Sequence, residues 1–250
     1  MVLTKEEVLS ILEKVVSKST ADQCEACFSG RSWSISRFAN SYIHQNVAED
    51  NRELALRVVS KKKVGKAKTN QLTSEAIADV VRRAEKIAGV QKEIEDFVSL
   101  PSPTSIPSVK GFFKKTVEVS PEERASVIKA SVDHSEDRGI DTVSGYYYTG
   151  VEELAVTNSL GIEAYFRGTI SSFKINATVE GATGVAENSS RNCQNLKPEA
   201  LTDRACEKAL AARDPEKIPN GVYPVILEEL AACEIAGYVA AYACGAQAYQ

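Results

Sequence analysis

The chain has 250 residues, of which 43% are hydrophobic and 26% charged, and its formal net charge of -4 gives a pI near 5.5. Such a composition is typical of a globular protein with a substantial core, and its acidic total argues against a surface that binds polyanions. No basic-then-apolar leader is visible, and the nearly uncharged run 235–250 is shorter than the roughly 20 apolar residues of a membrane span. We therefore expect a cytoplasmic protein with neither membrane nor nucleic acid among its partners.

The first part of the chain predicts a helix, a set of strands and a second helix. Thr4 and Glu7 form a capping box ahead of an apolar stripe that begins at Val8. From about 24 to 69 the apolar residues alternate, which is typical of strands, and the glycine-containing run 61–68 indicates a hairpin end. A helix is predicted from about 74 to 88, with Gly89 placed to end it.

The same order of elements follows a proline-rich segment. Three prolines and three serines between 100 and 111 predict an exposed connector. Ser120 and Glu123 then cap a helix to about 135. Four strand-like runs follow (142–150, 152–158, 161–173 and 175–187), with a hairpin turn at 158–161, and a helix is predicted from Pro198 to about 212.

These patterns predict an α+β fold of antiparallel sheets flanked by helices. Two helix–strands–helix units, joined by the connector, make one N-terminal domain over 1–219. Residues 220–250 predict a turn, a short buried strand and a helix, which we interpret as the beginning of a truncated C-terminal domain. Both strand sets contain an Asn-Ser pair, at 40–41 and 158–159, but this shared pattern is too small to establish a duplication.

The six cysteines do not predict a metal or redox site. Cys24 and Cys27 form a C-x-x-C, but a strand would place these two side chains on opposite faces of a sheet. Structural thiols are therefore favoured over a zinc or redox pair. The two histidines, His44 and His134, lie far apart in the sequence.

Five stretches resemble the TldD/PmbA family, which comprises metallopeptidases and their metal-free partner subunits and is also called modulators of DNA gyrase. They are 36–46 (SRFANSYIHQN), 54–77, the Leu-Pro at 100–101, 155–161 (AVTNSLG) and 219–227 (PNGVYPVIL), and they occur in the family's order. The resemblance implies the N-terminal domain of a dimeric cytosolic assembly that takes in unfolded peptide. It also implies that family members continue for almost as long again.

In the catalytic branch the resemblance implies a His-Glu-x-x-x-His helix just after the stretch that corresponds to 219–227. Here Glu234 is retained, whereas Cys233 and Tyr238 stand at the two histidine positions. A catalytic zinc takes about three protein ligands, and tyrosine is a poor one. Cys244 lies on nearly the same helical stripe as Cys233 but about 16 Å further along the axis, too far to complete the site.

This exchange predicts a PmbA-like, non-catalytic subunit with no catalytic residue, metal ligand or cofactor of its own. Zinc is expected in a TldD-like partner subunit, although self-association stays open, and unfolded peptide is the expected substrate. An edge strand could hold an extended peptide, with candidate edges at 36–46 and 162–173. Two alternatives stay open: a metallopeptidase completed by a missing C-terminal half, and a regulator linked to DNA gyrase without peptidase activity.

Overall fold

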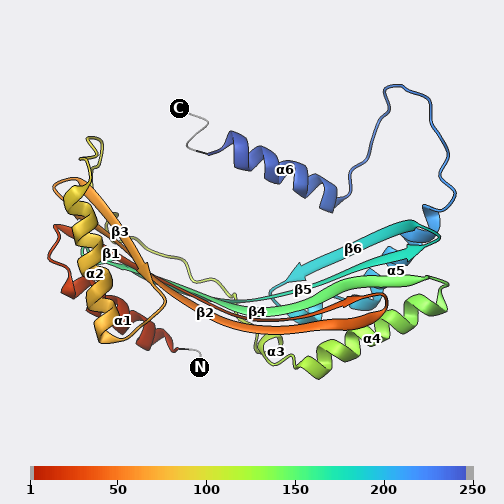
Figure 1. The fold of residues 1–250 in the computed structure, drawn as a ribbon, viewed down its shortest axis with the longest axis horizontal. Coiled ribbons are helices and arrows are strands. Elements are labelled where there is room, and N and C mark those ends of the chain that lie inside the picture. The colour runs from red at the N-terminus through yellow and green to blue at the C-terminus, as the bar shows by residue number, and fades with distance from the viewer. Residues whose placement is uncertain (1–2, 246–250) are drawn as a thin grey trace.

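The computed structural model describes residues 3–245. Two helix-and-strand units and a separate C-terminal helix follow one another along the chain (Figure 1). The elements are α1 (Lys5–Lys18), β1 (Gln23–Ala39), β2 (Tyr42–Ser60), β3 (Lys63–Thr69), α2 (Ser74–Val90), α3 (Lys114–Val117), α4 (Pro121–Asp137), β4 (Thr142–Asn158), β5 (Glu163–Val179), β6 (Ala182–Ser190), a short 3-10 turn (Cys193–Asn195), α5 (Pro198–Ala211) and α6 (Glu229–Ala243).

All six strands form one antiparallel sheet in the order β3-β2-β1-β4-β5-β6, so the predicted α+β class is confirmed. The four runs predicted after residue 140 are wrong as separate strands. The first two form the single strand β4, which passes through Gly150 without a turn, and β5 ends at Val179 within the fourth run. The missed turn is Glu180-Gly181, where both residues have positive φ, as in the tight hairpins whose twist matches that of the strands.

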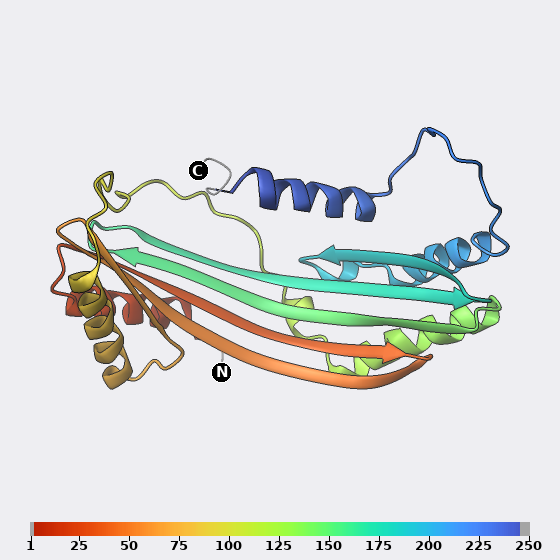
Figure 2. The same cartoon turned by 45° about the horizontal axis from the view of Figure 1, so that its top comes forward.

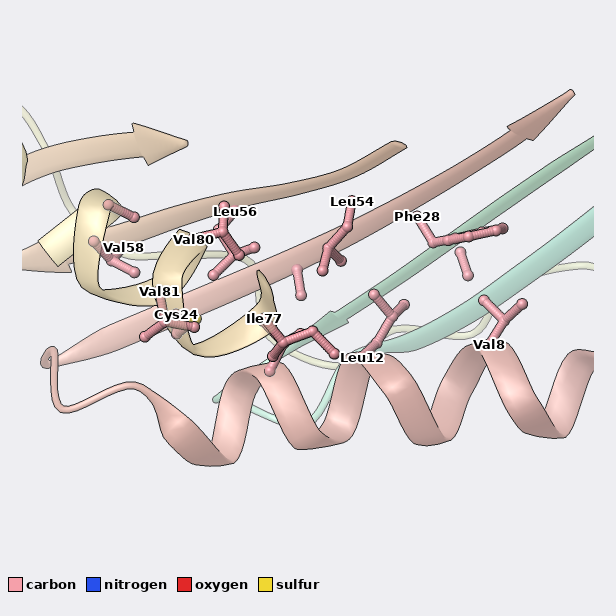
Figure 3. Packing of buried hydrophobic residues seen from close by; sticks show 14 of the residues in the cluster. Val8, Leu12, Cys24, Phe28, Leu54, Leu56, Val58, Ile77, Val80 and Val81 are labelled. Carbon is pink, nitrogen blue, oxygen red and sulfur yellow. The ribbon is translucent and has the colours of Figure 1, made fainter. Parts of the chain in front are cut away.

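Two separate hydrophobic cores lie under the two ends of this long sheet, one for each unit. In the first, α1 and α2 pack on β1 and β2, and the large side chains interlock as Figure 3 shows for Val8, Leu12, Phe28, Leu54 and Val80. In the second, α4 and α5 pack on β4 and β5 around Phe38, Phe173 and Ile175. Each fully buried large side chain contributes about 1.5–3 kcal/mol. Phe38 of β1 lies in the second core and Ala155 of β4 in the first, so each core also packs against a strand of the other unit.

The strand order shows that the two units are related by an approximate twofold axis between β1 and β4. Exchanging β1 with β4, β2 with β5 and β3 with β6 leaves the order of the sheet unchanged. The paired residues of the two hairpins also correspond, since Val58 faces Gly65 in the first unit and Ala177 faces Gly184 in the second. We call residues 5–90 the first repeat and residues 121–211 the second repeat.

The Asn-Ser pairs noticed in the sequence occupy equivalent places in the two repeats. Ser41 receives a hydrogen bond from the Val143 nitrogen at its Oγ (3.2 Å) and donates its own N–H to the Val143 carbonyl (3.0 Å). Ser159 does the same with Cys24, at 3.1 Å and 2.8 Å. Each hairpin serine therefore fastens the start of the central strand of the other repeat, a reciprocity that the sequence alone could not establish.

A glycine in each short edge strand lets a helix approach the sheet closely. A Cβ on Gly65 would overlap the Ala84 carbonyl oxygen and lie 2.5 Å from the Ala88 nitrogen in α2. Gly184 has the same relation to α5, where a Cβ would lie 2.5 Å from the Ala209 nitrogen. In both repeats, glycine in the edge strand and alanine in the helix thus let the two backbones touch. The two repeats share this close packing.

The proline-rich segment is an exposed connector, as predicted, and its two ends are anchored. Leu100 is buried and donates its N–H to Gln23, and the Pro101 carbonyl accepts a hydrogen bond from Asn158 (2.8 Å). At the far end, Thr169 donates its N–H to the Gly111 carbonyl (2.9 Å). The connector therefore leads from the β4–β5 turn to the middle of β5, and Figure 2 shows it beside the sheet.

The segment after α5 differs from its prediction. Residues 220–228 contain no strand, and Val222 and Ile226 are fully exposed, because no described segment lies beside them to pair with. The predicted helix is present as α6, on the opposite side of the sheet from α1 and α4 (Figures 1 and 2). Gly89 lies inside α2, which continues to Val90. Among the described helices, none combines the length and apolar character needed to cross a membrane.

Candidate functional site

Helix α6 carries all three residues that the sequence singles out. Cys233, Glu234 and Tyr238 are exposed on it, and Tyr238 stacks on Tyr242 with ring centroids 6.4 Å apart. Every described residue of α6 is exposed to some extent, since the helix makes its contacts with the rest of the fold mainly at its N-terminal end. Glu234 is therefore solvated, so its charge carries no cost of burial on this apolar helix.

Cys233 and Glu234 face a hollow of about 580 Å³ between α6 and the edge of the sheet, which we call the second-repeat hollow. Tyr238 is not part of its lining. The wall opposite α6 comes from the second repeat, so the hollow brings together residues that are far apart in sequence. Its lining residues are Lys174, Thr183, Gly184, Val185, Glu187, Lys208, Glu228, Leu230, Ala231, Cys233 and Glu234.

Ion pairs hold the start of α6 against α5. Arg204 binds Glu229 at 2.6 Å, and Lys208 binds Glu228 while donating to the Val185 carbonyl of β6 (3.0 Å). The hydrogen bond from Arg204 lowers the pKa of Glu229 to about 2, and that from Lys208 lowers the pKa of Glu228. Both carboxylates lie at the helix N-terminus, where the helix dipole also favours negative charge.

A polar network lines the sheet side of this hollow. Glu187 accepts hydrogen bonds from the Tyr146 hydroxyl (2.7 Å) and from Ser172 (3.4 Å), and its other oxygen lies 3.5 Å from Lys174. Burial is the main cause that raises the pKa of Tyr146, so this phenol stays protonated and donates. Sequence reasoning missed Lys174 and Glu187, because their pairing depends on the register that the Glu180-Gly181 turn sets.

The described residues do not bring a zinc ligand set together. Over residues 3–245 there is no group of three or more His, Cys, Asp and Glu side chains able to hold a metal ion. His44 lies on β2 beside Tyr42, and His134 lies on α4, where its Nε2 is 2.7 Å from Asp203. One thiol, one carboxylate and one phenol on α6 do not fit the ligand set of a zinc ion.

The C-x-x-C residues lie on opposite faces of β1, as predicted. Cys24 is buried in the first core, where burial raises the pKa of its thiol to about 11. Cys27 is half-buried on the other face, and burial also raises the pKa of its thiol. Both thiols are therefore poor nucleophiles and poor metal ligands at neutral pH.

Two strand edges are partly open, and the sequence located them in part. Residues 42–49 of β2 pair with β1 alone, because β3 covers only Leu54–Ser60. Residues 163–170 of β5 pair with β4 alone, because β6 begins its pairing at Ser171. The prediction was wrong for 36–38, which lie in β1 and pair with both β2 and β4, and for 171–173, which pair with β6.

Asp203 links α5 to α4 and should make stability depend on pH. It accepts hydrogen bonds from His134 and from Arg138, both at 2.7 Å, and the bond from His134 is the main cause that lowers the pKa of Asp203. A depressed carboxyl pKa stabilises the fold above the unfolded value of about 3.9, and this contribution is lost as the pH falls through the lower folded value.

We therefore expect Asp203→Asn to lower the thermal midpoint at neutral pH, with a difference from the parent that shrinks below about pH 4. Thermal unfolding followed by circular dichroism across a pH series measures this. Asp137→Asn, at the exposed C-terminal end of α4, should track the parent at every pH. A constant difference for Asp203→Asn down to the lowest pH would contradict the pairing.

Comparison with known proteins assigns the family. The profile described as PmbA/TldA metallopeptidase domain 1 matches residues 24–88, and the profile described as the PmbA/TldA metallopeptidase central domain matches residues 114–213. Together they cover more than half of the chain. The chain belongs to the PmbA/TldD family. The two matched regions also correspond to the two repeats, whose strands this family member joins into one sheet.

Solved structures show the same fold at low sequence identity. TldE from Thermococcus kodakarensis is 18% identical with a TM-score of 0.69, and the match covers 82% of this chain and 47% of that one. A protein from Thermotoga maritima titled as a modulator of a DNA gyrase is 19% identical with a TM-score of 0.74, covering 87% and 50%. A similarly titled protein from Bacteroides thetaiotaomicron is 16% identical with a TM-score of 0.73, covering 87% and 52%.

The PmbA/TldD chain described here thus spans about half the length of the solved structures that it matches. A comparison with curated proteins found no match. These findings establish the fold and the family.

Proposed function

We propose that this PmbA/TldD chain is a non-catalytic, PmbA-like subunit that helps to bind unfolded peptide and admit it to a zinc-bearing, TldD-like partner. The observation that carries the proposal is the donor set of α6. By the resemblance, Cys233 and Tyr238 take the positions of the two histidines of the catalytic branch. Residues 3–245 contain no group of three or more His, Cys, Asp and Glu side chains that could hold a metal ion. Without such a group, the chain's own contribution is binding and positioning.

The open strand edges support a role in holding extended peptide. A strand edge offers main-chain donors and acceptors whatever the sequence of the added peptide, so it suits varied unfolded substrates. Residues 163–170 of β5 are such an edge, and the connector makes one main-chain hydrogen bond there, from Thr169 to Gly111. A peptide could pair along the rest of this edge while the connector stays anchored at both ends.

We place this subunit in the cytoplasm, in a dimer with a TldD-like subunit or with itself. Zinc is expected in the partner, and neither nucleic acid nor membrane is expected as a ligand. The acidic net charge of -4 supports the exclusion of nucleic acid, because binding to the phosphate backbone depends on clustered cations.

The test measures zinc and hydrolysis with the intact polypeptide. We expect no stoichiometric zinc after dialysis and no cleavage of reduced, carboxymethylated lactalbumin by the protein alone, but cleavage when a TldD-type subunit is co-expressed. The double variant Cys233→His and Tyr238→His serves as a positive control, since it supplies two imidazoles beside Glu234 and should bind zinc more tightly than the parent.

Two alternatives define the contrary outcomes. Stoichiometric zinc together with turnover by the parent alone would show a metallopeptidase completed by other parts of the polypeptide. Absence of cleavage with every TldD-type subunit, combined with a direct effect on DNA gyrase supercoiling, would support a gyrase-linked regulator. Either result would overturn the proposed partner role.

A further inference from the structure

The connector lies beside the open edge of β5 in a defined register. Figures 1 and 2 both show it running alongside this strand, from the β4–β5 turn to the middle of β5. A Cβ on Gly161 would lie 3.4 Å from the Pro103 Cγ, and Gly111 accepts a hydrogen bond from the Thr169 N–H. Pro103 to Gly111 is a step of eight residues, and so is Gly161 to Thr169. We call residues 103–111 the strap.

The strap is nearly extended. A β-strand advances about 3.3 Å per residue, so the eight residues on the β5 side span about 26 Å. The strap covers this distance with the same number of residues, and a chain reaches at most about 3.6 Å per residue, which leaves about 3 Å of slack. Pro103 and Pro107 also favour extended backbone. The strap can therefore bow only a short way from the edge while both of its ends are held.

Buried contacts hold both ends of the strap. Just before it, Leu100 is only 2% exposed and donates its N–H to the Gln23 Oε1 (2.8 Å). At the far end, Gly111 is buried, and Phe113 donates its N–H to the Thr169 Oγ1 (3.1 Å). The strap is therefore fixed to both β1 and β5.

The middle of the strap is not fixed. Residues 104–110 are all exposed, and within the described part of the chain no backbone hydrogen bond joins them to β5. Since the Thr169 N–H points toward the strap, the main-chain groups of alternate residues, Tyr165 and Arg167 among them, point the same way. Pro107 has no N–H and so weakens any pairing of the strap with these groups. The strap thus lies along the β5 edge without pairing to it.

We propose that the strap controls the access of extended peptide to the β5 edge. This inference rests on the proposed role in holding peptide and adds how that site is regulated. A peptide that pairs with residues 163–168 takes the space beside the edge, so the middle of the strap must bow outward while its ends stay fixed. The short slack opposes this movement and weakens binding, as loops that cover exposed edges do. The length of the strap therefore sets the affinity for peptide.

Lengthening the strap tests this inference with every anchor intact. The variant carries a Gly/Ser insertion of about six residues between Thr104 and Ser105, in an exposed segment that tolerates added length. The probe is a fluorescein-labelled octapeptide of alternating threonine and valine, and fluorescence anisotropy measures its Kd with the intact protein. We expect the insertion to lower this Kd about fivefold, because the longer strap moves aside freely. The same insertion between Glu216 and Lys217, in the exposed segment after α5, should leave the Kd unchanged.

Releasing one end of the strap is an independent route to the same result. Gln23→Ala with Leu100→Ala removes the hydrogen bond and the buried side chain that hold its start, and should also lower the Kd. Hydrogen–deuterium exchange locates the peptide. At one subsaturating peptide concentration, residues 163–168 should be better protected in both variants than in the parent, whereas protection of the other open edge, 42–49 of β2, should not depend on the strap. A peptide N-methylated at alternate residues should protect neither edge, because it lacks the donors for strand pairing.

The contrary outcomes separate the strap from the peptide role. Equal Kd values for the parent and both variants would overturn the control by the strap and leave the peptide-holding proposal intact. Self-association of the insertion variant without a gain in peptide affinity would overturn it too, and would show that the strap shields the edge from a second copy. Absence of protection at 163–168 in every form would remove peptide from the β5 edge altogether. Zinc content, which tests the proposed subunit type, does not depend on the strap.

Discussion

Replacing Gly65 by alanine is expected to lower the free energy of unfolding by about 3 kcal/mol. The added Cβ would overlap the Ala84 carbonyl oxygen and lie 2.5 Å from the Ala88 nitrogen. Both atoms belong to the backbone of α2, which cannot move aside as a flexible side chain would. The helix must therefore shift from the sheet and loosen the first core, and chemical denaturation monitored by circular dichroism will measure the loss.

The same α2 helix offers the control for this prediction. Gly89 has no atom within 4 Å of the position that a Cβ would take, so Gly89→Ala should keep or raise stability, by up to about 1 kcal/mol. Gly184→Ala tests the relation between the repeats, because its Cβ would meet the backbone of α5 in the same way. A mild effect at Gly65 or a mismatch between Gly65 and Gly184 would contradict the shared packing.

Replacing Arg124 by alanine should destabilise the protein by about 2–4 kcal/mol. Arg124 is only 2% exposed, and its guanidinium donates to Ser36 Oγ (3.0 Å) and to the Val119 carbonyl (3.2 Å) and lies 3.4 Å from Asn46 Oδ1. These contacts join α4 of the second repeat to β1 and β2 of the first. Alanine leaves a cavity and removes the partners of buried polar atoms.

The control on the same helix is Lys129→Ala, whose exposed ammonium pairs with Asp133, and we expect no measurable change. Arg124→Lys should recover only part of the stability, because an ammonium cannot span three acceptors with the geometry of a guanidinium. Urea denaturation of the three variants will rank them. Equal stability of Arg124→Ala and the parent would show that the guanidinium is not needed to join the repeats.

The helices could be predicted because their signals are local. The sequence predicts two capping boxes, Thr4 with Glu7 and Ser120 with Glu123, and the structure contains both. Helices α1 and α4 begin directly after the N-cap residues Thr4 and Ser120. The boundaries of the strands were harder to predict. β4 continues through Gly150 because its pairing with β1 and β5 continues there, and only the sheet decides that a glycine is a strand residue and not a turn.

Of the candidate site, the sequence pointed only to the residues on α6. Cys233, Glu234 and Tyr238 were singled out because a resemblance to a short family motif suggested them, and the structure places them on α6. Lys174 and Glu187 carry no such motif, and they join the site through a hairpin register and through the position of α6 over the sheet. Long-range pairing of this kind leaves no local pattern in the sequence.

By itself, the sequence determined the α+β class, the helix boundaries near their capping residues, the exposed connector and the identity of the side chains on α6. The tertiary structure decided that the two units share one sheet, that Ser41 and Ser159 each hydrogen-bond to the other repeat, and that the start of α6 closes a hollow over the second repeat. The physical reason is range: capping and periodicity act over a few residues, whereas the pairing of β1 with β4 joins segments more than a hundred residues apart.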